Sequence, residues 1–586
     1  MSSSEPSSLP GAEPTLGADP QLGSEADAQP EARSDGDRPG GARRPGRRLL
    51  GRKPKQPRLE VDDVLVVKGS KVRTAIGGTV VGNVMEWFDF GVYGYMAIML
   101  SQLFFDTGSE SLDQILSLLG FAVSFLVRPF GGLVLGPLGD KIGRQKVLFF
   151  TMAMMALATA LIGVLPTISD IGVWAAFLLY ALKLVQGFST GGEYAGATTY
   201  VSEYAPDKKR GFYASTLDVG SYFGFALGAG AVALTHLITS AVWGPDAMLA
   251  WGWRVPFLIA IPLGAVAIWF RARIPETPAF EASEAEQEAQ GGSAAEDSSS
   301  LHARKGPINI VRYHWRELLI AVAIVAATNT TGYALTSYMP TYLGTQFGYN
   351  EMTSAATTIP ALLILCGMIP LAGKASDRFG RRAVYFTASA SAVVLMLPAF
   401  WLMHQSSFLE IQVAMLIVAL PVALFVGPSA AALPALFPTA ARYGAMGIAY
   451  NISVSLFGGT TPVISQTLIK WTGNSYMPAF WLMFFGLVAG IAVIFMSESA
   501  KRPLLGSFPS VETAEEAREL VAHQDENPLL NTSEMPIVVD PEMEAEIEAA
   551  MDVPGAGLPS EADAQLEDEG RDGSGASGAD RVGAGS

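Results

Sequence analysis

Cysteine and histidine are both scarce in this chain of 586 residues. Cys366 is the sole cysteine, which excludes a disulfide within the chain. The five histidines fall outside the middle of the apolar runs, and no nucleophile, metal-binding or phosphate-loop motif accompanies them. These absences argue against an enzyme, and they give no reason to expect a metal or an organic cofactor.

Hydrophobic residues make up 50% of the chain, which suits either several soluble domains or about a dozen membrane spans. The run lengths favour spans, because Val147 to Pro166, Ala383 to Met403 and Ala479 to Met496 each approach the ~20 apolar residues that cross a bilayer as a helix. We therefore predict an all-α integral membrane protein with twelve transmembrane helices in two six-helix halves. Their expected ranges are 74–104, 112–138, 147–166, 172–204, 212–240, 252–271, 317–344, 352–374, 383–403, 408–436, 443–470 and 475–497.

A loop signature occurs twice among these runs. Gly136 to Arg144 (GPLGDKIGR) returns 237 positions later as Gly373 to Arg381 (GKASDRFGR). A second pair, Pro206 to Arg210 and Pro438 to Arg442, repeats at an offset of 232 positions. Two signatures in the same order at nearly one offset indicate a duplicated unit, which is typical of transporters built from structural repeats around a central path.

Basic residues are concentrated in every second short loop. Lys141, Lys208 and Arg378 each belong to a basic loop, whereas the intervening loops have almost no basic residues. Since such loops stay on the cytoplasmic side, we expect a multi-pass protein of the cell membrane with both termini in the cytoplasm. Residues of the two repeated signatures are expected to bridge the halves there and to gate access: Asp140, Arg144, Arg210, Asp377, Arg381 and Arg442.

Polar segments surround and separate the two halves. The expected organisation is a disordered cytoplasmic tail (1–70), a first half (71–272), a cytoplasmic linker (273–315), a second half (316–497) and an acidic cytoplasmic tail (498–586). No signal peptide is apparent, because the first 60 residues are polar and rich in proline, glycine and arginine.

Both tails carry strongly biased charge. Arg43 to Arg58 holds eight basic residues and no acid, so this segment either fixes the topology or binds anionic lipids. Residues 498–586 hold 21 acidic and 5 basic residues, which accounts for the net charge of -16. That acidic tail is either solubilising disorder or a regulatory segment, with short helices expected after Thr513 and Asp540.

Ionisable residues inside the predicted spans all belong to the first half: Glu86, Asp89, Arg128, Lys183, Glu193 and Asp218. A charge at mid-bilayer costs at least ~2.5 kcal/mol, so each must face a cavity, find a partner or bind protons. Glu86 and Asp89 are three residues apart on one helix, and two nearby carboxylates resist double ionisation. The four acids are therefore candidates for proton coupling; alternatively, they form structural ion pairs with the two bases.

Polar and aromatic residues of both halves could bind a solute: Asn83, Trp87, Tyr93, Arg128, Lys183, Asn329, Tyr333, Tyr338 and Asn451. The two bases suit a carboxylate, and aromatic faces attract a quaternary ammonium group. The alternative is that the aromatic residues only pack in the bundle. In the second half the candidates are uncharged, which suits hydrogen bonding.

Longer motifs add a family resemblance over about residues 70–500. The motifs are GNVMEWFDF (82–90), RPFGG (128–132), QGFSTGGEY (186–194) and WGWRVPF (251–257). With the doubled loop, they resemble the major facilitator superfamily and, within it, the metabolite:proton symporter family. ATNTT (327–331), SYMPTY (337–342), FPT (437–439) and NISV (451–454) are most similar to the proline/betaine osmoprotectant symporters.

The resemblance implies proton-coupled symport of a zwitterion such as proline, glycine betaine or ectoine by alternating access. It also implies H+ as the coupling ion, a single chain as the functional unit, and no partner beyond the solute and the lipid bilayer; no nucleic acid is expected. Two alternatives are symport of an organic anion such as a dicarboxylate, citrate or shikimate-like acid, and a membrane sensor of a ligand.

Two features of this chain depart from the patterns of the related transporters. The acidic tail sustains no heptads, unlike the C-terminal coiled coil of osmosensory members. Phe225 follows Gly224 where the antiporter motif would have proline, which favours symport over antiport.

Overall fold

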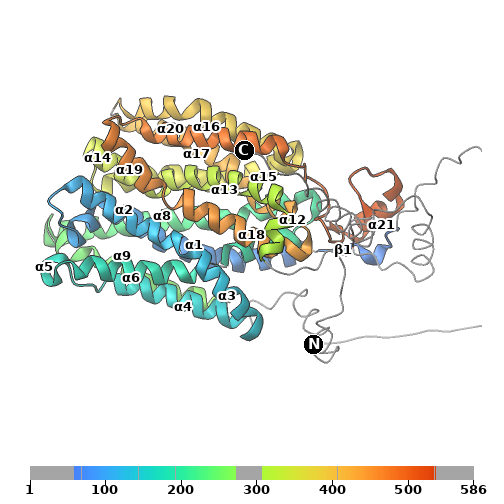
Figure 1. Ribbon diagram of the computed structural model, residues 1–586, viewed down its shortest axis with the longest axis horizontal. Coiled ribbons are helices and arrows are strands. Elements are labelled where there is room, and N and C mark those ends of the chain that lie inside the picture. Colours follow the sequence, from blue (N-terminus) through green and yellow to red (C-terminus); the bar gives the residue numbers. More distant parts are fainter. Residues whose placement is uncertain are drawn as a thin grey trace, which may run out of the picture. The chain divides into compact units, whose positions relative to one another are not determined.

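The computed structural model describes residues 58–271 apart from 68, 143 and 192, residues 307–532 apart from 406, and residue 535. Within these residues the chain is almost entirely helical, with one two-stranded sheet. Long helices lie side by side along a common direction (Figure 1). The polybasic segment before Arg58, most of the linker and the expected helix after Asp540 fall outside the described residues.

Twelve helical rods follow one another along the described residues, and several of them are interrupted. The first half contains α1 (Gly69–Phe104), α2 (Glu110–Leu126) with α3 (Arg128–Ile142), α4 (Arg144–Ile162), α6 (Trp174–Ser189) with α7 (Glu193–Tyr204), α8 (Arg210–Trp243), and η3 (Met248–Gly252) with α9 (Arg254–Leu258) and α10 (Ala260–Arg271). The second half contains α13 (Trp315–Tyr333) with η4 (Ala334–Tyr338) and α14 (Met339–Phe347), α15 (Glu351–Phe379), α16 (Arg381–Met403), α17 (Phe408–Ala432), α18 (Thr439–Ser453) with η6 (Val454–Gly458) and α19 (Thr461–Thr472), and α20 (Met477–Phe495). Shorter helical segments lie between the rods or beyond them: η1 (Val61–Asp63), α5 (Ile168–Ile171), η2 (Asp207–Lys209), α12 (Pro307–Tyr313), η5 (Pro434–Leu436) and η7 (Gln524–Glu526).

Nine helical stretches in the described ranges are long and apolar enough to cross a membrane. The other three rods are α1, α4 and α6 with α7. Glu86 and Asp89 lie within α1, and Lys183 lies within α6, so these rods carry charge inside their spans. In α4 the apolar stretch is shorter, Phe149–Ile162. The predicted all-α class and the order of twelve helices are confirmed.

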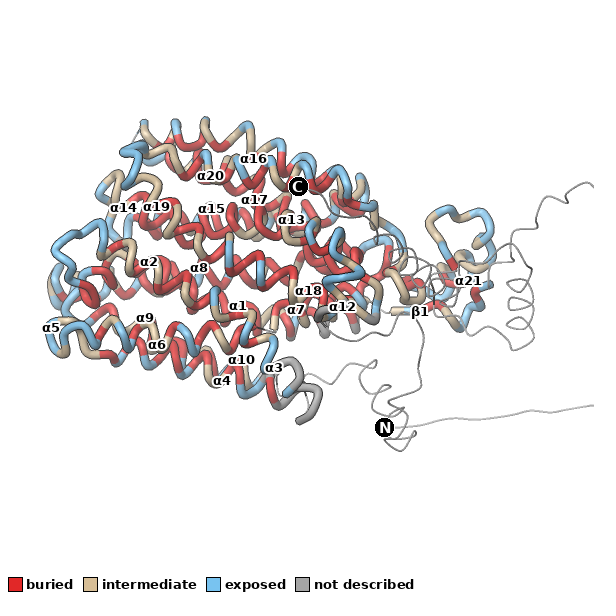
Figure 2. The backbone as a smooth tube through the Cα atoms, in the orientation of Figure 1, coloured by how far each residue is buried: buried red, intermediate tan, exposed pale blue. Residues whose placement is uncertain are grey.

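Apolar side chains also cover the outside of the bundle. Phe130, Trp174, Leu371 and Phe495 are each more than half exposed. Buried residues gather on the inward faces of the rods, and exposed residues line their outer faces (Figure 2). An apolar exterior with polar groups turned inward is the arrangement that a lipid environment requires.

Two rods of the first half, each predicted as a single helix, are broken where they cross. Pro129 lacks a backbone N–H and follows the break between α2 and α3. Gly191 lies in the break between α6 and α7, and a Cβ atom there would be 2.2 Å from the carbonyl oxygen of Arg128. A Cβ atom on Gly187 would be 1.8 Å from the carbonyl oxygen of Ser124. Backbone therefore touches backbone, and Arg128 lies at the crossing, inside the bundle.

Two rods of the second half contain wide helical turns. The π-helical segment η4 comes just before Pro340, and η6 comes just before Pro462. A proline ring collides with the carbonyl group four residues earlier, and a π turn relieves that collision. Both irregular segments contain buried polar residues, including Tyr338 and Ser455.

Segments from both tails form a small sheet. β1 (Leu65–Val66) pairs in parallel with β2 (Ser510–Val511), and α21 (Ala514–Ala522) follows β2. Thr513 Oγ1 accepts a hydrogen bond from the Glu516 backbone N–H at 3.2 Å, so the helix start predicted there is confirmed. Ala517 of α21 packs with Val64 and Val511 in a small apolar cluster. Parts of both predicted tails are thus packed on each other.

The C-terminal segment also contacts one arginine from each half. Arg210 Nη1 donates to the carbonyl oxygen of Arg502 at 2.9 Å, and Arg442 Nη2 donates to that of Leu505 at 2.8 Å. These arginines are the matched ends of the second repeated signature. Each also donates from Nε to a carbonyl oxygen eight residues earlier, at 3.0 Å and 3.2 Å respectively. The duplicated arginine therefore has the same local role twice, and residues 502–505 join the halves.

We expect Gly187→Ala to lower the melting temperature of the purified protein by several degrees. The added methyl group meets the Ser124 carbonyl oxygen, and overpacking of this kind costs about 1–3 kcal/mol. The matched control is Gly230→Ala on α8, where nothing lies within 4 Å of the added Cβ atom. Thermal unfolding in detergent measures both variants, and equal melting temperatures would contradict the close crossing.

Candidate functional site

A small cavity of about 40 Å³ lies between the two halves. Its walls come from α1, α7 and α8 on one side and from α13, η4, α17 and α18 on the other. The lining residues are Trp87, Tyr194, Asp218, Ser221, Tyr222, Phe225, Val325, Thr328, Asn329, Gly332, Tyr333, Thr336, Val426, Ser429, Leu433 and Tyr450. A space of this size holds a few water molecules and no amino acid, so a larger solute requires the walls to move apart.

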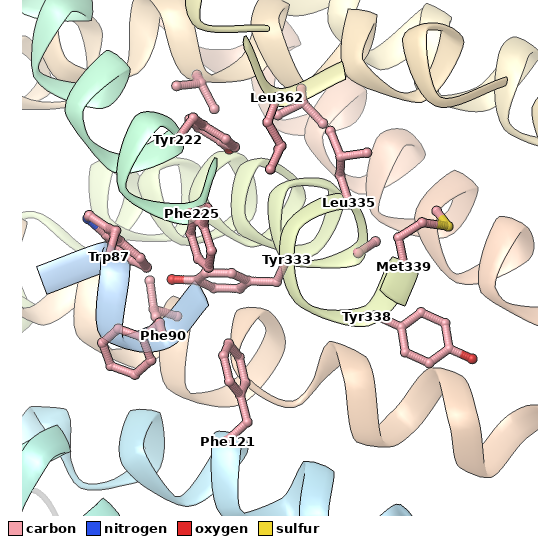
Figure 3. Close-up of a cluster of buried hydrophobic side chains, with 14 of the residues drawn as sticks. Trp87, Phe90, Phe121, Tyr222, Phe225, Tyr333, Leu335, Tyr338, Met339 and Leu362 are labelled. Atoms are coloured by element: carbon pink, nitrogen blue, oxygen red, sulfur yellow. The ribbon is translucent and has the colours of Figure 1, made fainter. Parts of the chain in front are cut away.

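Aromatic rings from both halves pack along one wall of this cavity. The Trp87 ring centroid lies 5.4 Å from that of Phe225 and 5.9 Å from that of Tyr333. Tyr333 reaches from α13 between the rings of the first half, with Phe90 and Phe121 beyond it (Figure 3). Asn83 Oδ1 accepts a hydrogen bond from Trp87 Nε1 at 2.9 Å, which fixes the indole. The predicted residue Asn83 thus supports the wall, while Trp87 and Tyr333 form it.

Asp218 projects into the cavity from α8. Its side chain is 5% exposed, and Oδ1 accepts a hydrogen bond from the Tyr194 hydroxyl at 2.8 Å. Oδ2 has no hydrogen-bond partner among the residues that the structure describes. Of the described lining residues, Asp218 is the one with a charge.

Glu86 and Arg128 form a buried ion pair beside the cavity. Arg128 Nη2 donates to Glu86 Oε1, and Arg128 Nε donates to Thr190 Oγ1 at 2.8 Å. The guanidinium carbon lies 5.6 Å from the Trp87 ring centroid and 5.1 Å from that of Phe125. Trp87 therefore contacts both the ion pair and the cavity. In this conformation Glu86 therefore forms an ion pair with Arg128, which was the alternative to a role in proton coupling.

Asp89 and Lys183 belong to a separate polar chain within the first half. Asp89 Oδ2 accepts a hydrogen bond from Thr159 Oγ1 at 2.6 Å, and Gln186 Nε2 donates to the same hydroxyl oxygen at 2.8 Å. Lys183 Nζ donates to Gln186 Oε1 at 2.5 Å and lies 4.2 Å from the Tyr93 ring centroid. Gln186 and Thr159 thus connect the acid to the base. Neither Lys183 nor Tyr93 is among the lining residues of the cavity.

Other predicted solute-binding residues hold helices together in this conformation. Tyr93 donates from its hydroxyl to the Ser117 carbonyl oxygen at 2.8 Å, and Tyr338 donates to Gln466 Oε1 at 3.0 Å. Asn451 Nδ2 donates to the Gly191 carbonyl oxygen at 2.7 Å, in the break between α6 and α7. Asn329 lines the cavity, and Glu193 begins α7 with a half-buried side chain.

Twelve of the sixteen lining residues were not among the predicted site residues, and four of these twelve are aromatic: Tyr194, Tyr222, Phe225 and Tyr450. Two of them are sequence neighbours of predicted candidates, Glu193 and Asn451, and Tyr222 lies one helical turn beyond Asp218. Its spacing from Asp218 places Tyr222 on the same polar face of the predicted helix. The stack of Tyr194 on Tyr450, with ring centroids 4.2 Å apart, joins distant segments and has no local signal.

Contacts between the halves flank the cavity at both ends of α15. Near the beginning of α15, Thr358 Oγ1 is hydrogen-bonded to the Tyr95 hydroxyl. Near its end, the Asp377 carboxylate accepts the backbone N–H groups of Gly211 and Phe212, each at 2.8 Å. The carboxylate of one half therefore caps the first turn of α8 in the other half, where a helix favours negative charge.

Most predicted gating residues take part in this end of the bundle. Arg381 Nη2 pairs with Asp377 Oδ1 at 2.7 Å, and Arg442 Nη1 pairs across the halves with Glu203 Oε1 at 2.7 Å. Arg210 is paired with Asp207 within its own half. Asp377, in the second copy of the first signature, therefore bridges the halves with Arg381 holding its carboxylate, and Arg442 of the second signature makes another bridge. The side chains of Asp140 and Arg144 lie outside the described part of the chain.

We expect Asp377→Asn to loosen this end of the bundle, because the amide loses the charge and part of the cap on α8. Cys366 reports the change, since its Sγ lies 3.8 Å from the Val219 carbonyl oxygen between α15 and α8. Maleimide labelling of Cys366 should become several times faster than in the parent protein. Asp246→Asn, in an exposed loop, serves as the control. Equal labelling rates in both variants would rule out a gating role for Asp377.

Comparisons with known proteins match this architecture. The sugar (and other) transporter family matches residues 76–506. The ectoine/proline transporter ProP of Corynebacterium glutamicum is 56% identical over 481 residues, covering 82% of this chain and 95% of the relative. The glycine betaine/proline/ectoine/pipecolic acid transporter OusA of Dickeya dadantii is 41% identical over 471 residues, covering 80% and 92%. The proline/betaine transporter of Escherichia coli is 41% identical over 478 residues, covering 81% and 94%.

Solved structures show the same fold at low sequence identity. The proton:xylose symporter XylE, a major facilitator superfamily protein, matches with a TM-score of 0.60 and 18% identity over 77% of this chain and 99% of that chain. The partially occluded inward-open form of XylE from E. coli gives a TM-score of 0.55 at 17% identity, covering 73% and 99%. The relatives are transporters rather than enzymes, and the resemblance predicted from the motifs is confirmed. This chain is therefore a multi-pass membrane protein of the sugar (and other) transporter family, with the major facilitator fold.

Proposed function

We propose that this protein is a secondary active transporter that takes up zwitterionic osmolytes, such as proline, glycine betaine or ectoine, together with protons. The names of the relatives support this class of solute. The observation that carries the proposal is the cavity between the halves, next to a buried acid–base pair that shares Trp87 with it. Coupling requires proton binding and solute binding to affect each other. Trp87 provides the contact between the ion pair and the cavity.

Glu86 is the proposed coupling acid. In the ionised state its carboxylate holds Arg128, and loss of that partner from a buried pair is strongly unfavourable. Protonation removes the charge on Glu86 and frees the guanidinium group for the carboxylate of an entering solute. The solute then replaces Glu86 as the partner of Arg128, so that proton and solute are bound together.

The organic-anion alternative has less support from the geometry. It depends on Arg128 and Lys183 as two carboxylate-binding bases in one site. Lys183 instead lies in the polar chain with Gln186 and against the Tyr93 ring, away from the cavity lining. Arg128, which lies behind Trp87 in the cavity wall, is the one base left for a dianion, and it already has Glu86 as its partner.

We place both termini on the cytoplasmic side, because the basic short loops lie at that end of the helices. The pairing of β1 with β2 supports a common side for the two tails. The proposed location is the bacterial cell membrane, with the proton as the coupling ion.

Uptake into proteoliposomes tests the proposed function. With an imposed inward proton gradient, we expect labelled proline and glycine betaine to accumulate, and a protonophore should abolish the accumulation. Xylose serves as the control solute, since the similarity to XylE extends to the fold alone. Failure to accumulate either zwitterion, with a dicarboxylate accumulating instead, would favour the organic-anion alternative.

We expect Glu86→Gln to abolish proton-driven accumulation, since glutamine can hydrogen-bond to Arg128 but cannot exchange a proton. Exchange of labelled for unlabelled solute across the vesicle, which needs no net proton movement, should continue. Asp246→Asn is the control variant for insertion and folding. Concentrative uptake by the Glu86→Gln variant would remove this residue from the coupling mechanism.

A further inference from the structure

Asp218 is a buried carboxylate with an incomplete set of hydrogen bonds. Tyr194 satisfies Oδ1, while Oδ2 has no partner in the described part of the chain. A buried charge without compensation is costly, and the protein interior normally supplies a base or several donors. The side chain also lines the cavity, so a group that enters the cavity can reach the free oxygen.

The buried bases of the first half are engaged elsewhere. Arg128 binds Glu86 and Thr190, and Lys183 binds Gln186. Of the described residues that line the cavity, none carries a positive charge. A positive partner for the ionised Asp218 carboxylate would therefore be supplied by the solute.

Aromatic rings make the rest of this wall suitable for an organic cation. Tyr194 and Tyr450 stack with an interplanar angle of 21°, and Tyr222 lies one helical turn from Asp218 on α8. Trp87 and Phe225 continue the wall. Ring faces attract an ammonium group with no directional requirement, whereas a hard metal ion needs a shell of several oxygens.

We propose that Asp218 is the counter-ion for the cationic end of the solute and that the surrounding tyrosines enclose the alkyl groups on its nitrogen. This inference rests on the proposed function and adds a fixed orientation of the bound solute. The ammonium end points toward α8 and the carboxylate end toward Arg128. Asp218 then determines specificity for zwitterions, while Glu86 handles the proton.

Two ligands of the same shape test the inference. Glycine betaine and 3,3-dimethylbutanoate differ by a quaternary nitrogen in place of a carbon, so both have the carboxylate and one has the cation. Binding is measured on the full-length protein in nanodiscs, without a proton gradient, by displacement of labelled betaine. The parent protein should bind betaine roughly tenfold or more tightly than the carbon isostere, as expected for a hydrogen-bonded or closely paired charge.

Asp218→Asn should bring the two affinities to within about twofold, mainly through weaker betaine binding. Asp218→Glu should keep a preference for betaine, and Asp246→Asn should behave as the parent protein does. A merely structural role of Asp218 predicts equal losses for both ligands, which would overturn the inference. Retained discrimination in Asp218→Asn would assign the carboxylate to proton binding instead and would also overturn it.

If the Asp218→Asn protein does not fold, the parent protein alone decides the question. Equal binding of betaine and 3,3-dimethylbutanoate by the parent protein would exclude a counter-ion in the site. Accumulation of zwitterions in the proteoliposome assay together with this result would leave the proposed function intact and reject the role of Asp218. Absence of any zwitterion uptake would reject the proposed function itself.

Discussion

Every charge inside a membrane bundle needs a partner, and this requirement explains how the first half is built. Glu86 and Arg128 satisfy each other, and Arg128 is brought to the interior by the broken crossing of two rods. Removing one member of a buried pair costs about 3–5 kcal/mol, so the pair stabilises the crossing as long as both charges are present. The glycines allow the backbones to touch and so bring Arg128 inside the bundle. The ion pair in turn stabilises that contact.

The two halves differ in how their buried polar groups find partners. In the second half, neutral groups such as Asn451 and Ser455 bind carbonyl oxygens of the first half, at Gly191 and Phe125. These carbonyl groups lie at or beside the ends of broken helices, where intrahelical partners are missing. The first half thus holds the charges of the predicted spans, and the second half supplies donors to carbonyl groups at the helix breaks of the first.

Much of this could be predicted from sequence because it depends on local signals. Apolar run length gave the helices, and the doubled signatures gave two halves whose arginines, Arg210 and Arg442, have matching contacts. The helix breaks were missed, because Gly191 differs from an ordinary helical glycine only in what it packs against. The composition of the cavity was partly missed for the same reason: Tyr194 and Tyr450 meet only in three dimensions.

Residues 502–505 attach the C-terminal segment to both halves of the helical bundle. Arg210 and Arg442 hold two carbonyl oxygens of this segment only three residues apart, and the arginines belong to opposite halves. Three residues span at most about 10 Å when fully extended, so wide separation of the halves at this end would break at least one of the two anchors. If alternating access separates the halves at this end, the chain beyond the last transmembrane rod passes from a two-anchored to a one-anchored form and gains freedom to meet other molecules.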